Sequence, residues 1–183
     1  MRKKKGEELY FVTLTSSYLA YLGSYESKVS KKTDRPFIGV ILKVENREYF
    51  APLSSPKEKH KKMRETMDII KIKNGKLGVI NLNNMIPVLN HYKSMIKVNL
   101  SILKKSDNIN DKKYYLLLDK QLKFCNEIHQ EIFEKAQILY DTFSKDFSEL
   151  TKIERKMYRR VNNFKVLEHA SKEFEKEYIT ELL

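Results

Sequence analysis

The chain has 183 residues, of which 41% are hydrophobic; this is enough for one folded domain with a substantial core and argues against a disordered chain. Thirty-six Lys and Arg residues against 24 Asp and Glu residues leave a formal net charge of +12. Such an excess favours nucleic acid as a partner, because neutralising phosphates releases condensed counterions. No apolar run reaches the ~18 residues of a membrane-spanning helix.

The N-terminus and the rare residues exclude further classes. The basic N-terminus leads into Glu7 and Glu8 rather than an apolar segment, which excludes an ordinary signal peptide. An anionic membrane surface is the weaker alternative partner, since no strongly amphipathic segment adjoins residues 2–5. One cysteine and four scattered histidines predict neither a disulfide nor a metal cluster. A soluble, cytoplasmic protein is expected.

The first fifty residues have the composition of strands with one helix among them. Aromatic and β-branched residues predict strands at 9–14 and 37–44, and a turn at 45–47 leads into a partner strand at 48–51. Between the first two strands, a short helix is predicted from Tyr18 to Leu22, ending at Gly23 and followed by a polar loop. Gly39 indicates a bulge or a close approach of another backbone.

Pro52 is expected to end the strand that starts at residue 48, because proline has no N–H to donate. Ser54 and Ser55 would then lie on irregular backbone that a ligand can reach. Further along, Asn74-Gly75 predicts a hairpin between 67–73 and 76–82. An edge strand at 85–88 and a final strand at 94–103 complete a small, strongly bent antiparallel sheet or open barrel.

From residue 110 the apolar period changes to that of a helix. One long amphipathic helix, with room for a single break, is predicted to reach Phe143, followed by a connection with some helical turn over 144–163 and a last helix from Phe164. Cys125 lies on the apolar stripe, so a buried structural thiol is favoured over a nucleophile. The chain therefore predicts one α+β domain over 1–183, sheet-rich over 9–103 and helix-rich over 110–183.

The stretch YFAPLSSPKEKHKK at 49–62 is the candidate site. Hydroxyls and fixed positive charge at the end of a strand suit a phosphate, and a histidine beside them can carry protons near neutral pH. The alternative is a solvated basic loop. The residues concerned are Ser54, Ser55, Lys57, Lys59, His60, Lys61 and Lys62.

Six segments, in order, resemble the ToxN/AbiQ family, the protein toxins of type III toxin–antitoxin systems. LxSPK and NNMIPV are the most specific parts of the resemblance, which covers most of the chain. The segments are FVTLTSSYLAYL, RPFIGVIL, YFAPLSSPKEKHKK, GKLGVINLNNMIPV, KQLKF and NFKVLEHASKEFEK.

The resemblance implies a bent sheet like that of MazF and Kid toxins, with flanking helices, and a sequence-specific endoribonuclease that needs no metal or other cofactor. Attack of the ribose 2′-hydroxyl on its own phosphodiester would leave 2′,3′-cyclic phosphate and 5′-hydroxyl ends. Members of the family process a repetitive antitoxin transcript into pseudoknots that inhibit the toxin in a closed cyclic protein–RNA complex. Cellular or phage RNA would be the substrate, in abortive phage defence, with neither DNA nor a membrane as partner.

The family's catalytic motif falls on Ser54, Ser55 and Lys57, and its basic residue before the FIG strand falls on Arg35. In-line attack needs the negative charge of the phosphorane stabilised. Lys57 and Arg35 are candidates for this role, Ser55 for holding non-bridging oxygens and Ser54 for orienting the 2′-hydroxyl. His60 is a candidate proton carrier; contact with RNA phosphate and a plain surface position are its alternatives.

RNA recognition would use the tyrosine of the first helix, Tyr18, together with basic side chains. For the strand aromatics that flank the site, Tyr10, Phe37, Tyr49 and Phe50, core positions are favoured over stacking. The basic positions expected to face the antitoxin are Lys59, Lys61, Lys62, Lys73, position 119, Lys120 and Lys123. A noncatalytic RNA-binding or regulatory protein is the alternative function, and paired hydroxyls beside a lysine argue against it.

Overall fold

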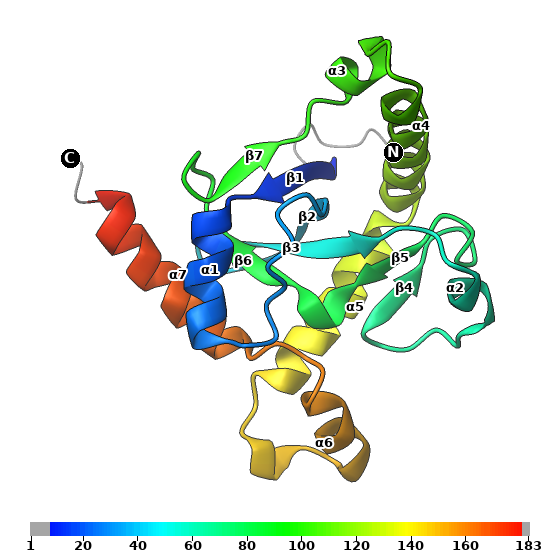
Figure 1. Ribbon diagram of the computed structural model, residues 1–183. Coiled ribbons are helices and arrows are strands. Elements are labelled where there is room, and N and C mark those ends of the chain that lie inside the picture. The colour runs from blue at the N-terminus through cyan, green and yellow to red at the C-terminus, as the bar shows by residue number, and fades with distance from the viewer. Residues whose placement is uncertain (1–7, 181–183) are drawn as a thin grey trace.

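An antiparallel sheet lies at the centre of the computed structural model, which describes residues 8–180 (Figure 1). Within those residues it has seven strands in the order β4-β5-β3-β2-β1-β7, and β6 pairs with β3 as well. The strands are β1 (Tyr10–Leu14), β2 (Phe37–Val44), β3 (Arg47–Ser54), β4 (Ile69–Lys71), β5 (Val79–Asn81), β6 (Ile86–Val88) and β7 (Met95–Lys97).

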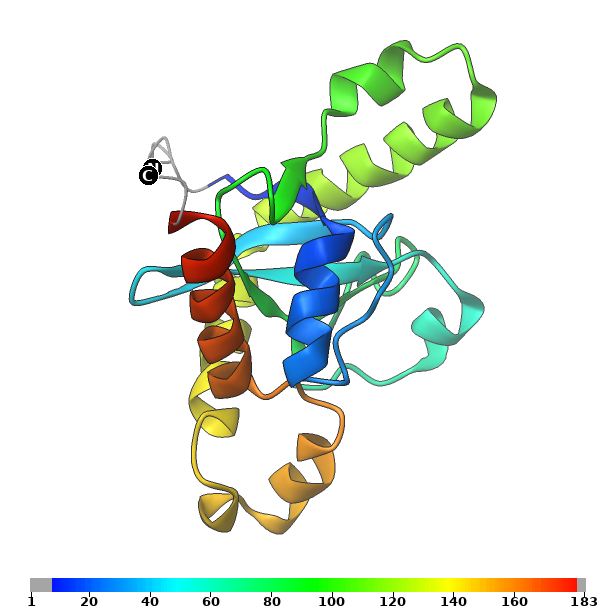
Figure 2. The same cartoon turned by 60° about the vertical axis from the view of Figure 1, so that its left-hand side comes forward.

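Helices cover the sheet, and two of them project from it. They are α1 (Ser16–Tyr25), α2 (Glu58–Lys62), α3 (Leu100–Lys105), α4 (Ile109–Glu127), α5 (His129–Phe143), α6 (Lys152–Tyr158) and α7 (Phe164–Tyr178), with short 3-10 turns η1 (Leu82–Asn84) and η2 (Phe147–Glu149). Figure 2 shows α3 and α4 extending away from the sheet as a hairpin. The α+β prediction is confirmed. No helix within residues 8–180 is both long and apolar enough to cross a membrane.

Side chains that alternate along the strands build two apolar cores. Val12 and Leu14 pack with helices α1 and α7, whereas Phe11 belongs to the core that contains residues of α4 and α5. On β3, Phe50 belongs to the first core and Tyr49 to the second. This period of two is what a sheet buried on both faces requires, and it places β3 in the middle of the molecule.

Strand β2 spans the predicted residues and carries the irregularity that Gly39 indicates. The register between β2 and β3 shifts between Ile38 and Leu42. A methyl group at Gly39 would overlap the ring of Phe50, whose Cγ atom lies only 2.6 Å from the position of that methyl. The predicted bulge is confirmed, and the group that comes close is an aromatic side chain rather than a backbone.

The predicted C-terminal ends of one helix and one strand are wrong. Helix α1 continues past Gly23 to Tyr25, because Leu19 and Leu22 are buried and their packing offsets the ~1 kcal/mol that a helical glycine costs. Strand β3 continues through Pro52, which pairs with β2, as far as Ser54. Proline lacks only the N–H, and its carbonyl still accepts a hydrogen bond from a neighbouring side chain.

The later elements follow the predictions except at one place. The hairpin at 67–82 forms as β4 and β5, and the long helix breaks once, at Ile128, between α4 and α5. The strand predicted at 94–103 is limited to Met95–Lys97. The Asn99 side chain accepts a hydrogen bond from the backbone of Ser101 and caps helix α3, and asparagine there favours a helix start over a longer strand.

Candidate active site

The end of strand β3 brings together a hydroxyl, a guanidinium and a side-chain amide. The Ser54 Oγ accepts a hydrogen bond from Arg35 Nη2 at 3.1 Å and another from Asn81 Nδ2 at 3.1 Å. Because both acceptor positions of a hydroxyl oxygen are then used, its own proton is left to donate to a ligand. The geometry makes Ser54 a fixed donor.

Two hydrogen bonds hold the Arg35 side chain against the end of strand β3. Its Nε donates to the carbonyl of Leu53 at 2.8 Å while its Nη2 reaches Ser54. Burial lowers the pKa of this guanidinium, but arginine stays protonated in proteins. A positive charge is therefore fixed beside the Ser54 hydroxyl.

A cavity of about 470 Å³ opens onto this group. Three of its side chains are cationic, namely Lys32, Arg35 and Lys57, and one, Asp34, is anionic. A net positive charge therefore favours an anion in the cavity. Four of the five predicted catalytic residues are brought together here. The lining consists of Ser30, Lys32, Asp34, Arg35, Pro36, Leu53, Ser54, Ser55, Lys57 and Tyr114.

Asn81 and Gly78 complete the site and were not predicted. The Asn81 amide also donates to the carbonyl of Pro52 at 3.0 Å, so one side chain fixes both the strand and the hydroxyl. Gly78 has a φ of +100°, and a Cβ there would overlap the carbonyl oxygen of Ser54. Only glycine lets the hairpin lie this close to β3. Both residues lie in the GKLGVINLNN segment, and its resemblance to the family was the signal that could have identified them as part of the site.

His60 does not line the cavity onto which the Ser54 hydroxyl opens. It lies on α2 with only 3% of its surface exposed. Its Nδ1 has no hydrogen-bond partner within residues 8–180. Burial, followed by the charges of Lys59 and Lys57, lowers its pKa below the ordinary 6.5. The alternative of a plain surface position is wrong.

Tyr18 is not available to RNA. Its side chain is fully buried, and its hydroxyl donates toward the carbonyl of Pro87 at 2.8 Å and Ser171 Oγ at 3.0 Å. The predicted RNA-binding role of Tyr18 is therefore wrong, and the residue instead joins α1 to β6 and α7. The strand aromatics Phe37, Tyr49 and Phe50 are core residues, as favoured.

The predicted basic surface is largely present. Position 119 is wrongly predicted as basic: it is Asp119, whose carboxylate pairs with Lys123 Nζ at 2.8 Å. Lys61 likewise pairs with Glu58 at 2.6 Å. The basic tail at 2–5 lies outside the described residues. The predicted lysines are all exposed, namely Lys59, Lys61, Lys62, Lys73, Lys120 and Lys123.

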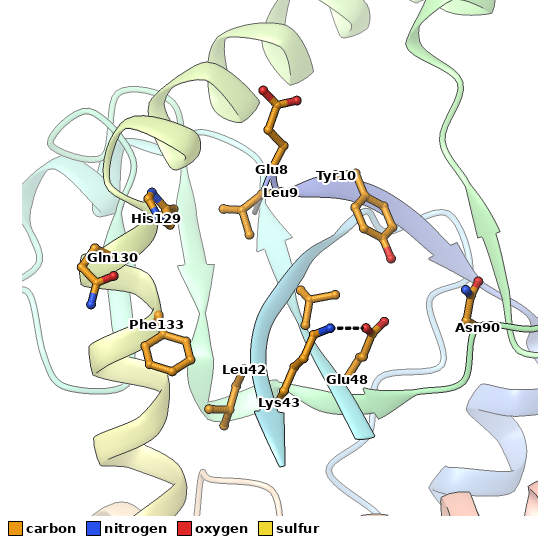
Figure 3. A pocket seen from close by; sticks show the side chains of 11 residues that line it. Glu8, Leu9, Tyr10, Leu42, Lys43, Glu48, Asn90, His129, Gln130 and Phe133 are labelled. Atoms are coloured by element: carbon orange, nitrogen blue, oxygen red, sulfur yellow. Dashed lines mark ion pairs between the residues drawn. The ribbon is translucent and has the colours of Figure 1, made fainter. Parts of the chain in front are cut away.

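A second, larger cavity of about 570 Å³ lies between the sheet and helix α5 (Figure 3). Its wall includes Tyr10, Phe133 and His129, and an ion pair joins Lys43 Nζ to Glu48 at 2.9 Å. No serine or threonine is among its described lining residues. The smaller cavity is therefore the better candidate for phosphate chemistry.

Comparison with known proteins assigns the family. The family model of the toxin ToxN of type III toxin–antitoxin systems matches residues 10–172. The chain belongs to this family. Arg35, Ser54 and Asn81 all lie within the range that the ToxN model matches.

Curated relatives and a solved structure agree with this ToxN-family membership. Endoribonuclease ToxN of Pectobacterium atrosepticum is 30% identical over 179 residues, covering 91% of this chain and 94% of the relative. Endoribonuclease AbiQ of Lactococcus lactis subsp. lactis is 32% identical over 145 residues, covering 72% of this chain and 74% of the relative. A solved structure of AbiQ, a lactococcal anti-phage endoribonuclease, has a TM-score of 0.75 at 26% identity, covering 93% of this chain and 99% of that chain.

A further solved structure shows likeness of fold. It comes from a bacterial type III toxin–antitoxin system with selective toxin inhibition by a non-coding RNA pseudoknot, and its TM-score is 0.79 at 24% identity. The match covers 93% of this chain and 99% of that chain. The fold is thus shared along nearly the whole length of both chains.

Proposed function

We propose that this member of the ToxN family is a sequence-specific endoribonuclease toxin that cuts RNA through the ribose 2′-hydroxyl, without a metal ion. The products are a 2′,3′-cyclic phosphate and a 5′-hydroxyl. The observation that carries the proposal is the Ser54 hydroxyl, which accepts from Arg35 and Asn81 and keeps its proton free. The endoribonucleases among the relatives support the reaction class.

The reaction builds negative charge on the non-bridging oxygens of the phosphate as the 2′-oxygen attacks. Donors fixed in advance at that position stabilise the transition state more than the ground state. Ser54 supplies one such donor, and Arg35 and Lys57 supply positive charge in the same cavity. Ser55 lines the cavity at the next position and holds a second oxygen. The bond from the 2′-oxygen to phosphorus forms as the 2′-hydroxyl gives up its proton to a base, the bond to the 5′-oxygen breaks, and the leaving oxygen takes a proton from an acid.

Proton transfer falls to groups that line the cavity, which Ser55 and Lys57 do and His60 does not. A residue that transfers a proton contributes roughly 10²–10⁴-fold to the rate. We therefore expect His60→Ala to retain cleavage within about tenfold, short of that range. A larger loss in a variant that still folds would restore His60 as a proton carrier.

Family membership and net charge both point to RNA as the inhibitor of this protein. We infer that the toxin cuts a repetitive antitoxin transcript into pseudoknotted units, which bind back to it in a closed cyclic complex. The exposed lysines of α2 and α4 and the net charge of +12 support an RNA partner. Free toxin would cut cellular or phage RNA in abortive phage defence, a role that the anti-phage relative supports.

The decisive experiment is cleavage of a cellular RNA pool by the purified protein in excess EDTA. Wild type should cut, leaving cyclic-phosphate and 5′-hydroxyl ends, and Ser54→Ala should lose roughly 10²–10³-fold in rate. Ser148→Ala, at an exposed serine on η2, is the matched control and should cut like wild type. A substrate with a single 2′-deoxyribose at the cut position should resist.

The alternative, a noncatalytic RNA-binding protein, has a distinct outcome. Wild type would then bind the RNA pool tightly and leave it intact, and expression in cells without the antitoxin would not arrest growth. A binder of that kind has no use for a hydroxyl that two donors hold at the edge of a cavity.

A further inference from the structure

One aromatic ring reaches the Ser54 cavity from a distant part of the chain. Tyr114, near the start of helix α4, lines the cavity together with Ser54, Ser55 and Lys57, and it is the one aromatic residue among the described lining residues. Its side chain is 37% exposed. Part of the ring is therefore open to a ligand in the cavity.

Helix α4 is anchored to the core one turn after Tyr114. Tyr114 lies one turn before Leu118, on the same side of α4. Leu118 is buried in the core, and the buried Gln121 donates from Nε2 to the carbonyl of Leu77 at 2.7 Å. The apolar stripe of α4 thus enters the core at Leu118, and Tyr114 lies just beyond the edge of the core. The anchored helix therefore sets the backbone position of Tyr114, while part of the residue stays exposed.

The charges near Ser54 and near Tyr114 differ. Arg35 donates a hydrogen bond to the Ser54 hydroxyl, whereas burial and then the negative charge of Asp34 raise the pKa of the Tyr114 phenol. The positive charge beside Ser54 attracts a phosphate. The aromatic face of Tyr114 offers a phosphate no such charge and therefore suits the uncharged part of a nucleotide.

We propose that Tyr114 is the stacking platform for a nucleobase next to the scissile phosphate, and so a substrate-binding residue of this site. The inference rests on the proposed ribonuclease function, which it deepens. Aromatic side chains commonly stack on the bases of single-stranded RNA. Replacing one such aromatic residue with alanine weakens RNA binding roughly 5–150-fold. The ring positions the base, and the base positions the phosphate over Ser54.

A fluorescence titration tests the contact directly, since the chain contains no tryptophan. The Tyr114→Trp substitution, made together with Ser54→Ala to keep the RNA intact, gives a protein with a single tryptophan. A short single-stranded RNA should quench its emission, whereas inorganic phosphate and an abasic oligomer of equal length should not. Tyr92→Trp, at an exposed tyrosine outside the cavity, is the matched control and should not respond. RNA binding without quenching in the Tyr114→Trp protein would overturn the proposal.

A kinetic comparison separates the ring from the hydroxyl. Tyr114→Phe keeps the ring and should lose less of its kcat/KM than a variant that has no ring. Tyr114→Leu keeps the bulk but has no aromatic face, and its kcat/KM should fall roughly 5–150-fold, mainly through KM. Equal losses of kcat/KM in both variants, or no loss in Tyr114→Leu, would overturn the stacking proposal. The Ser54→Ala result would still test the ribonuclease function separately. If wild type does not cut RNA at all, the titration still decides whether a base lies on this ring.

Discussion

Asn81 offers the sharpest test of how the Ser54 hydroxyl is held. Its amide donates to the carbonyl of Pro52 at 3.0 Å and to Ser54 Oγ at 3.1 Å. In Asn81→Ala both bonds are lost, and a net contribution of ~0.5–1.5 kcal/mol per hydrogen bond predicts a loss of roughly 1–3 kcal/mol in the free energy of unfolding. The hydroxyl keeps Arg35 as its single donor, so the rate should fall less than in Ser54→Ala.

Asn81→Asp has nearly the same shape and the opposite hydrogen-bonding character. A carboxylate accepts and cannot donate when ionised, so the Ser54 proton would turn toward position 81 and away from the substrate. The new negative charge also opposes the phosphate. Cleavage by Asn81→Asp should therefore be slower than by Asn81→Ala, approaching the loss of roughly 10²–10³-fold expected when the donor itself is removed.

Single-turnover cleavage of a defined RNA gives the rates, and urea unfolding gives the stabilities of the same preparations. The control is Asn83→Asp, a nearby amide that donates to the carbonyl of Arg160 at 3.0 Å rather than to Ser54. If Asn81→Asp cuts faster than Asn81→Ala, the Ser54 proton does not act as a donor to the substrate, and the assigned role of Ser54 is refuted.

Three further outcomes follow from contacts described above. Arg35→Lys should reduce the cleavage rate at least about tenfold despite keeping the charge, since one ammonium cannot reproduce the planar fork that joins Leu53 and Ser54; wild-type kinetics would contradict this. Because burial lowers the pKa of His60 below 6.5, the unfolded chain binds its proton first, so stability should fall as the pH drops below about 6.5; urea midpoints at pH 7.5 and 5.5 should differ less in His60→Gln. Burial raises the pKa of Cys125 to about 12, so iodoacetamide should label it only after unfolding, as mass spectrometry would show.

The sequence predicts well what depends on local order. Strand β2 and the break in the long helix follow from composition and period, because one face of each element must be apolar. The Ser54 motif and Arg35 lie on either side of a predicted hairpin, so their meeting is a consequence of pairing neighbouring strands. Ser54, Arg35 and Lys57 could therefore be predicted from the sequence.

What escaped prediction depends on register and on burial. Asn81 and Gly78 face Ser54 only because β5 pairs with the end of β3, and a shift of one residue would turn Asn81 to the other face. His60 is polar and lies among lysines, which gives no sign that its ring is buried. Tyr114 has the same helical period as the core residues after it, and its spacing does not reveal that burial along α4 begins only at Leu118.

If Ser54 acts as proposed, the pairing of β5 with β3 also sets when the toxin can become active. The Ser54 hydroxyl receives its second donor from Asn81, which lies 27 positions later in the chain. A product of interrupted synthesis that ends before residue 81 carries the whole SSPK motif and Arg35 but cannot hold the hydroxyl in place. Truncated fragments should therefore be harmless to the cell that makes them, and toxicity should begin only with a chain long enough to close its sheet.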